Sequence, residues 1–296
     1  MRSTLARQST PMNAPTLNQQ SLSILVRRCP RLVGLHQANT ELLSLSQDNE
    51  TSVARIEKSI LKNPELTAKV LRTAGSAAFG GRQIRTVGQA VMILGLPTVR
   101  SLILSVLFDS SARQGQHAEG FDTNRYMKRA LATALLSRAF SRRATGLDPE
   151  EMYIMGLLQD IGYVVLDNIC PPLLAKVIEA LPVTAEPTIE VEEKICGTHH
   201  AAIGGMLAAE WNFAPDVRDG IGHHHTPFEA PRETSVAVAV AHAASWAADT
   251  LGLTIVPKMQ NEPLNEFVAH DIGLTASDAE SVAASLSEEV EFLTAA

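Results

Sequence analysis

Aromatic residues and cysteines are scarce in this chain. Phe, Trp and Tyr together make up 4% of its 296 residues, and cysteine occurs three times, as Cys29, Cys170 and Cys196. An odd number of widely spaced cysteines, without a CxxC pair, argues against a disulfide-stapled fold and favours reduced thiols in the cytoplasm. Because Ala, Leu and Val supply most of the apolar residues, we expect helices packed on helices.

The chain also lacks the hydrophobic runs of membrane proteins and secreted precursors. No apolar stretch reaches the roughly 18 residues that a transmembrane helix needs. The first 11 residues contain arginines, Ser and Thr without an apolar segment, so we predict neither a secretory signal nor membrane insertion. The pattern leaves open whether Met1 or Met12 is the native start.

Charge of one sign is missing at each end of the chain. No acidic residue precedes Glu41, and no Lys or Arg follows Lys258, whereas eight acidic residues do. With a net charge of −7 and a sequence pI near 5.7, the chain lacks the basic clusters that neutralise phosphates, so we expect no nucleic-acid partner. The two ends are either simply solvated, or one of them docks on a charged partner or on the other end.

Helical periodicity dominates from Leu17 onward, and no segment shows strong β alternation, so the predicted fold class is all-α. We divide the chain into four parts. Residues 1–16 are polar and contain two prolines, which is typical of a disordered tail. Residues 17–114 form an N-terminal helical bundle, residues 115–255 a second helical bundle, and residues 256–296 an acidic helical extension.

Several helix boundaries can be predicted from the sequence. Asn63 and Asp148 are each followed by proline and an acid, which is the composition of a capped helix start. Residues 94–97, Leu-Gly-Leu-Pro, predict a sharp break between two helices. Thr275, with Asp278 three residues on, predicts the capped start of the last helix.

The most informative stretch runs from Leu157 to Gly162, where an apolar helix ends in the pair Gln159-Asp160. A His-Asp pair at such a place can bind one metal ion with both side chains. Here glutamine stands in the place of histidine, and its amide oxygen is a poor ligand for the metals that imidazole binds well. Histidines follow as His199-His200 and as the triplet 223–225, so the chain keeps part of a metal site and lacks another part.

In this order and spacing, these residues resemble the HDOD output-domain family, a branch of the HD-domain superfamily of metal-dependent phosphohydrolases. The resemblance covers most of residues 20–250. In the first half it rests on residues 63–72, 76–80 and 89–95, with Gly75 in a place where the family usually has Asn. In the second half it rests on residues 197–204, Trp211, Ile221, His224, His225 and Pro227.

The resemblance implies an N-terminal bundle that leads into a degenerate HD-like bundle. Arg129 stands where an active HD site has a histidine, Gln159 replaces the histidine of the pair, and Ser245 stands where the closing Asp is expected. Tyr163 replaces a frequent phosphate-contacting lysine. Of the four core ligands only Asp160 remains. Because a guanidinium is always charged and cannot ligate a metal, we predict an Arg129–Asp160 salt bridge in place of the ion.

His200, His224 and His225 match extra ligands that some superfamily members use for a further metal. We expect no metal and no other cofactor, with a divalent ion held by these histidines and Asp160 as the minor alternative. The simpler interpretation is that the histidines are inherited core and helix-end residues that bond to backbone groups and have no ligand. We predict no catalytic residue.

We therefore predict a non-catalytic signal-transduction or regulatory module of the bacterial cytoplasm that acts through contacts with a protein partner. Its degenerate pocket would serve as a structural hub or a small-ligand site, formed by Arg129, Gln159, Asp160, His200, His224, His225 and Ser245. Two alternatives stay open. One is a metal-dependent phosphohydrolase that acts on a nucleotide or a cyclic dinucleotide, and the other is a sensor of an anionic, nucleotide-like ligand.

Overall fold

The computed structural model describes residues 53–61, 64–76, 79, 84–112, 117–257, 259 and 262–295. Within these residues all regular secondary structure is helical and no strand occurs, which confirms the all-α class. None of the described helices is both long and apolar enough to cross a membrane. The predicted tail over 1–16 and the predicted cap at Asn63 lie outside the described residues.

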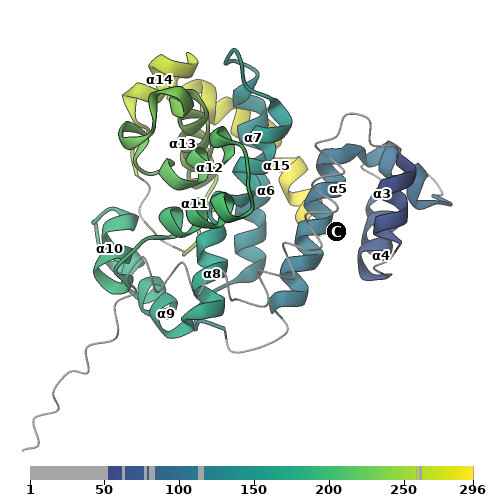
Figure 1. The fold of residues 1–296 in the computed structure, drawn as a ribbon, viewed down its shortest axis with the longest axis horizontal. Helices are drawn as coiled ribbons and strands as arrows, with labels where there is room; N and C mark the ends of the chain where they lie inside the picture. The colour runs from purple at the N-terminus through teal and green to yellow at the C-terminus, as the bar shows by residue number, and fades with distance from the viewer. Residues whose placement is uncertain are drawn as a thin grey trace, which may run out of the picture.

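The first described helices form a small unit of their own (Figure 1). They are α3 (Val53–Ile60), α4 (Pro64–Ala74) and the long α5 (Val87–Ala112), and their buried side chains make one hydrophobic cluster. The predicted break inside α5 is confirmed, because Gly95 has φ 73° and ψ 160°. A positive φ is readily adopted only by glycine, so Gly95 allows the kink within α5.

A larger bundle follows, and it holds the second hydrophobic cluster. Its helices are α6 (Thr123–Ser141), α7 (Pro149–Leu158), α8 (Ile161–Ile169), α9 (Pro171–Ala180), α10 (Thr188–Cys196), α11 (His200–Glu210), α12 (Pro215–His223), α13 (Ser235–Thr250), α14 (Glu266–Ile272) and α15 (Ala276–Ala295). Short 3-10 turns lie at Leu181–Val183, Pro227–Glu229 and Arg232–Thr234. Helix α5 also contacts α6 and α7, and so joins the small unit to this bundle.

Capping residues define several of these helices as the sequence predicts. The Asp122 carboxylate accepts the backbone N–H groups of residues 124 and 125 at the start of α6, and Asp148 accepts that of Glu150 at the start of α7. Thr275 and Asp278 bond to each other's backbone N–H groups at 3.1 Å and so fix the start of α15. Such bonds satisfy amides that a helix start otherwise leaves unpaired.

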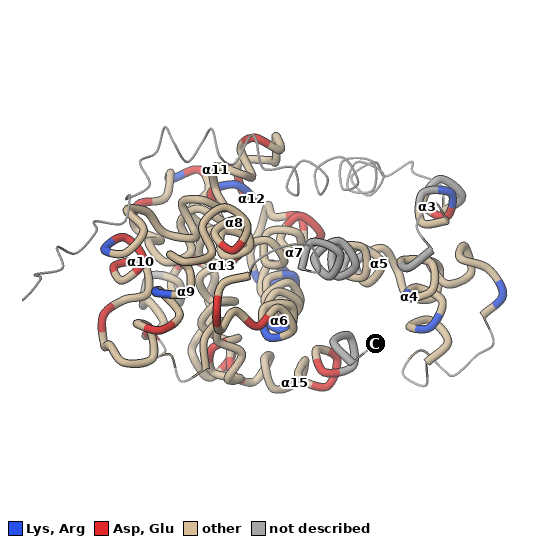
Figure 2. The backbone as a smooth tube through the Cα atoms, turned by 90° about the horizontal axis from the view of Figure 1, so that it is seen from below, with Lys and Arg blue, Asp and Glu red and all other residues tan. Residues whose placement is uncertain are grey.

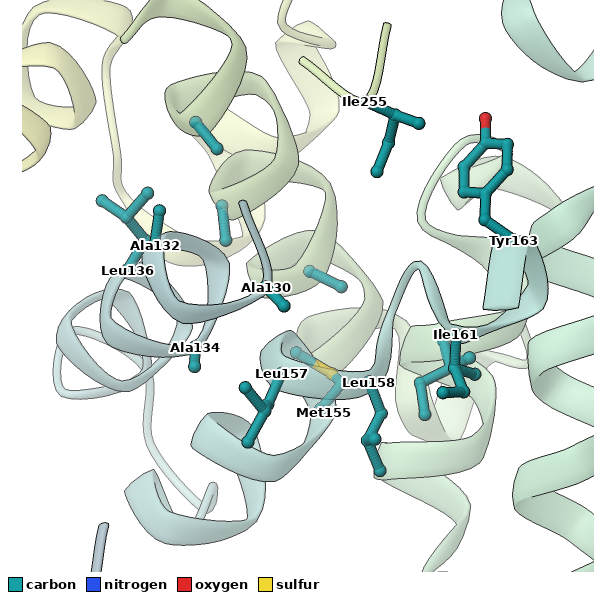
Figure 3. Packing of buried hydrophobic residues seen from close by; sticks show 14 of the residues in the cluster. Ala130, Ala132, Ala134, Leu136, Met155, Leu157, Leu158, Ile161, Tyr163 and Ile255 are labelled. Carbon is teal, nitrogen blue, oxygen red and sulfur yellow. The ribbon is translucent and has the colours of Figure 1, made fainter. Parts of the chain in front are cut away.

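The centre of the bundle is packed with small residues, which lets helices lie close together. In Figure 3, Ala130 and Ala134 of α6 lie on the side of α7, which carries Met155 and Leu157, whereas Ala132 points to the other side of α6. At Gly156 of α7, a Cβ atom would lie 2.3 Å from the carbonyl oxygen of Thr133, so only glycine fits between the two helices. Small residues in place of aromatic ones thus allow the helices of this core to lie close together.

The acidic C-terminal segment is part of this core and not an appendage to it. Helix α15 packs on α6 and α13, and its residues Ala279, Ala283 and Val290 are buried in the second cluster. Its acidic residues, drawn red in Figure 2, lie among exposed positions of the same helix, such as Glu280 and Glu288. The stretch that we predicted as an extension over 256–296 therefore completes the bundle.

Candidate functional site

The predicted site residues come together at the junction of α6, α8, α11, the end of α12, and α13. The turn between α7 and α8 carries Gln159 and Asp160, and α8 then runs directly against the start of α11. A Cβ atom on Gly162 would lie 2.0 Å from the carbonyl oxygen of His200, so only glycine allows this approach. The close crossing brings Asp160 beside His200.

Arg129 lies at the centre of one side of the site, and its side chain is 2% exposed. Its Nε donates to Asp160 Oδ2 at 2.7 Å, its Nη2 donates to Ser245 Oγ at 2.7 Å, and its Nη1 donates to Asp249 and to the Leu253 carbonyl. The predicted Arg129–Asp160 salt bridge is confirmed. We call Arg129, Asp160, Ser245 and Asp249 the arginine cluster.

The two carboxylates of the arginine cluster respond differently to the same guanidinium. Burial raises the pKa of Asp160, but Arg129 and His200 outweigh it and hold the pKa below its ordinary value. Burial dominates at Asp249, where Arg129 compensates only in part and the pKa stays above its ordinary value. Asp160 is therefore the carboxylate that carries the negative charge of this pair most firmly.

On the other side of Asp160 lie three of the five predicted histidines. One ring nitrogen from each of His200, His224 and His225 lies within 4.8 Å of those of the other two. The Nε2 atoms of His200 and His224 are 3.3 Å apart, and Asp160 Oδ1 is 3.5 Å from the first and 3.8 Å from the second. We call His200, His224, His225 and Asp160 the histidine cluster.

His200 is fixed by residues that the sequence analysis did not identify as part of the site. Its backbone N–H and its Nδ1 both bond to the carboxylate of the fully buried Glu192, at 2.7 and 2.8 Å. The Tyr163 hydroxyl donates to the same carboxylate, and the Tyr163 ring stacks on His200 with 4.3 Å between ring centroids. Burial raises the pKa of Glu192, but the charge and hydrogen bonds of His200 outweigh it and lower that pKa.

The other two histidines have partners of their own. His224 Nδ1 donates to the Ile221 carbonyl at 2.9 Å, and His225 Nδ1 lies 3.2 Å from Glu262 Oε2. The opposite oxygen of Glu262 accepts the backbone N–H of Thr188 at 3.0 Å. Burial works against ionisation of both groups, yet their contact raises the pKa of His225 and lowers that of Glu262 to about 2.

The remaining predicted histidines do not join the cluster. His199 caps α11, where its Nδ1 accepts the backbone N–H of Ala202 at 3.2 Å, and burial lowers its pKa to about 4. His223 ends α12 and is partly exposed. His199 therefore acts as a helix-end residue that bonds to the backbone. His224 does so only in part, because its ring bonds to a backbone carbonyl and also faces His200.

Gln159 occupies the position of the missing histidine and is fully buried. Neither its amide nitrogen nor its amide oxygen has a hydrogen-bond partner among the described residues. The amide takes part in neither the arginine cluster nor the histidine cluster.

A narrow pocket lies beside the histidine cluster. It is lined in part by His225, His242, Trp246 and Glu262 and has a cavity volume of about 10 Å³. That is room for roughly one water molecule.

Comparison with known proteins confirms the family that the sequence predicts. The family model described as HDOD domain matches residues 32–227 of the chain. A curated protein of Treponema pallidum, named only as uncharacterized, is 25% identical over 236 residues, which is 78% of this chain and 45% of that protein. The chain therefore spans less than half the length of this relative.

Solved structures of the same fold are also similar to the chain. An HDOD domain protein of Geobacter sulfurreducens aligns with a TM-score of 0.69 at 21% identity, over 94% of this chain and 97% of that chain. A Marinobacter aquaeolei protein, provisionally named for signal transduction, gives 0.72 at 18% identity over 88% and 57%. A Shewanella amazonensis protein, provisionally named a phosphohydrolase, gives 0.65 at 22% identity over 90% and 98%. At these identities the likeness shows the fold.

Proposed function

We propose that this chain, which belongs to the HDOD domain family, is a non-catalytic signalling module that acts through protein–protein contacts. The observation that carries the proposal is the buried Arg129 guanidinium, which bonds to Asp160, Asp249 and Ser245. A guanidinium supplies positive charge beside Asp160, but it neither activates water nor offers an open coordination position, which metal-dependent hydrolysis requires.

The space around the site favours the same proposal. The narrow pocket beside the histidine cluster has room for about one water molecule, so it is not preformed for a nucleotide or a cyclic dinucleotide. This argues against both alternatives that the sequence left open, the phosphohydrolase and the nucleotide sensor, at this position of the fold.

The names of the similar structures point to two different functions, signal transduction and phosphohydrolysis. The Marinobacter protein is named for signal transduction and the Shewanella protein for phosphohydrolysis. Arg129 and Gln159 stand at two positions where the resemblance implies metal-binding histidines. The local chemistry therefore favours signalling over hydrolysis.

Exposed apolar side chains of the small N-terminal unit are the contact residues that we would test first. Three of the five large hydrophobic residues that are exposed in the described chain belong to it, namely Val53, Leu61 and Met92, and Met92 is 69% exposed. An exposed apolar side chain can pack against another protein, so these residues are the first positions to substitute.

The decisive experiment is an activity assay on the full chain with phosphomonoesters, nucleotides and cyclic dinucleotides, in buffers that contain Mn²⁺, Zn²⁺ or Fe²⁺. We expect no turnover above the protein-free background. Turnover that disappears in Asp160→Asn would overturn the proposal and favour the phosphohydrolase.

Contact with a partner is tested with a pair of matched variants. Met92→Glu places a charge on the small N-terminal unit, whereas Val183→Glu places one on an 85%-exposed side chain of the larger bundle. We expect proteins that co-purify with the wild-type chain to be lost from Met92→Glu and kept by Val183→Glu. Equal retention by both variants would place the contact elsewhere.

A further inference from the structure

Charge is divided unequally between the two units of the fold. Residues 53–112, which hold the small N-terminal unit, contain eight Lys and Arg and three Asp and Glu. Residues 113–296 contain 12 Lys and Arg and 26 Asp and Glu. The first range therefore has a net charge of +5 and the second one of −14, although the chain as a whole is acidic. In Figure 2, blue segments lie on α3 and α4, whereas red segments are spread over the larger bundle.

Among the described side chains of the small unit, the exposed charges are all positive. Lys58 of α3, Arg72 of α4 and Arg85, which precedes α5, are exposed. Glu57, the acid of this unit whose side chain is described, is half-buried beside the start of α5. A Cβ atom on Gly88 would lie 2.7 Å from its Oε2. A molecule that approaches this unit therefore meets mainly cations.

One face of α5 joins a cation to an exposed apolar side chain. Arg85, Gln89 and Met92 follow each other at spacings of four and three residues, so they lie along one side of the first turns of the helix. The backbone N–H of Arg85 donates to Gln89 Oε1 at 3.1 Å and fixes the start of this row. Met92 is 69% exposed, and Ile93 beside it is half-buried. We call Arg85, Gln89, Met92 and Ile93 the α5 face.

The opposite side of the same helix supplies the core of the unit. Its residues in the hydrophobic cluster follow the helical spacing of a buried side, and they are Val87, Ala90, Val91 and Leu94. Burial on that side satisfies the packing of α5, so the exposed side chain of Met92 has no role in the core. A methionine is flexible and fits irregular surfaces, which suits it to contact with another molecule.

We infer that the α5 face docks an acidic surface of another protein, with apolar side chains at the centre of that surface to cover Met92. This inference rests on the proposed signalling function and names the chemistry of its partner. The positive charge of the small unit steers an acidic partner toward it and speeds up association. Burial of Met92 against apolar groups then stabilises the complex.

The described residues favour a protein over nucleic acid or an anionic membrane. Proteins that bind single strands stack bases on aromatic side chains, whereas Phe79, the described aromatic residue of the small unit, packs against its hydrophobic cluster. The larger bundle, with its net charge of −14, repels a polyanion or a membrane that extends beyond the small unit. A protein with a local acidic surface can contact the α5 face and avoid the bundle.

The first test titrates a designed helical peptide, with Leu on one face and Glu on the other, into the full chain. We expect saturable binding at low salt that weakens as salt is added, because salt screens exposed charges. Two comparison peptides, one with Lys in place of Glu and one with Gln in place of Leu, should bind roughly 10-fold more weakly or worse. No binding of the acidic peptide, or equal binding of all three peptides, overturns the inference.

Matched charge reversals show which unit binds the peptide. The test variant reverses three exposed cations of the small unit by Lys58→Glu, Arg72→Glu and Arg85→Glu. The control variant reverses three exposed cations of the larger bundle by Lys128→Glu, Arg142→Glu and Lys176→Glu, and so changes the net charge by the same amount. We expect the test variant alone to lose roughly 10-fold or more in affinity for the acidic peptide. Equal losses would contradict a site on the small unit, and circular dichroism shows whether each variant is folded.

A second pair of variants places the contact on the α5 face itself. Met92→Ser removes the apolar centre without adding a charge, and Val183→Ser does the same at an exposed position of the larger bundle. We expect Met92→Ser to weaken binding of the acidic peptide roughly fivefold or more, as truncation of a central contact residue does, and Val183→Ser to leave it unchanged. Unchanged binding by Met92→Ser would move the site away from α5.

Other occupants give different results in the same experiments. Duplex DNA or phosphatidylglycerol vesicles that bind the chain more tightly than the acidic peptide would overturn the inference in favour of a polyanion. Sedimentation velocity of the wild-type chain alone tests a second copy, and salt-sensitive self-association that the charge reversals of the small unit abolish would favour that copy instead. These failures leave the proposed function standing, since that proposal is overturned separately by turnover that depends on Asp160.

Discussion

The two oxygens of Asp160 face two different surroundings. Oδ2 meets Arg129, a cation that the chain itself carries, and the arginine cluster is complete without any ligand. Oδ1 lies 3.5 and 3.8 Å from the Nε2 atoms of His200 and His224, whose Nδ1 atoms bond to Glu192 and to the Ile221 carbonyl. One oxygen of this carboxylate is therefore held by a short salt bridge, whereas the other oxygen faces two imidazoles at longer distances.

The two clusters also depend on different parts of the fold. The arginine cluster joins α6 to α13, two helices that pack along each other in the centre of the bundle. The histidine cluster depends on the close crossing of α8 and α11 at Gly162 and on the bend that follows α12. Changes in one cluster should therefore be separable from changes in the other, except at Asp160, which belongs to both.

The largest effect that we expect is that of Arg129→Met. It leaves Asp160 and Asp249 buried without their cation, and removal of one partner of a buried ion pair typically costs about 3–5 kcal/mol. The free energy of unfolding, measured in urea without added metal, checks this value. Arg125→Met is the matched control on the same helix, because Arg125 bonds to the Gly252 and Thr254 carbonyls and to no carboxylate of the described residues. Equal losses of unfolding free energy in the two variants would show that the arginine cluster contributes no more to stability than the Arg125 contacts.

The next effect in size is that of Gly162→Ala, which should affect the histidine cluster first. The new methyl group would meet the His200 carbonyl at 2.0 Å, so α8 and α11 must move apart. We expect a loss of about 3 kcal/mol in the free energy of unfolding, the upper end of what overpacking costs. Gly222→Ala is the control, since its methyl group would have its nearest neighbour at 3.7 Å and alanine favours a helix. A Gly162→Ala chain with the unfolding free energy of the wild type would remove the argument that glycine is required there.

The sequence was sufficient for the helices and for one half of the site. Helix starts at Asp148 and Thr275 follow from local capping chemistry, which acts within three residues and is visible in any sequence. The Arg129–Asp160 pair could be predicted because the resemblance placed opposite charges at one position. Asp249 was missed, although its spacing of four residues from Ser245 puts both on one face of α13.

Glu192 and Glu262 could not be predicted in the same way. Each is an ordinary acidic residue in an acidic stretch, where composition predicts solvent exposure. Glu262 in particular lies in the segment that we predicted as an extension, and it reaches His225 and Thr188 only because that segment folds back on the bundle. Contacts between residues of different helices or loops depend on the tertiary structure, about which local patterns say nothing.

A smaller effect should follow from Ser245→Ala, which removes one bond of the arginine cluster and leaves the histidine cluster intact. The hydroxyl accepts from Arg129 Nη2 at 2.7 Å, and a hydrogen bond to a charged group contributes about 1.5–3 kcal/mol. We expect a loss near the lower value, because Asp160 and Asp249 still bind the guanidinium. Ser235→Ala, at a half-buried serine at the start of the same helix whose hydroxyl donates to the Arg232 carbonyl, should cost less because no charged group loses a bond. Equal losses in the two variants would mean that the bond to Arg129 contributes no more than a bond to a neutral carbonyl.

The smallest effect that we expect is a gain in stability, from a substitution at Gln159, which takes part in neither cluster. Both polar atoms of the Gln159 amide are buried without a partner among the described residues, and such a group costs about 1–3 kcal/mol in desolvation. Gln159→Met keeps the approximate length and volume of the side chain and removes the polar atoms, so we expect a gain of about 1 kcal/mol in urea unfolding. The Arg129–Asp160 pair should be unaffected. A loss of stability instead would show that the amide bonds to a buried water or an ion, and that the position of the missing histidine still takes part in the site.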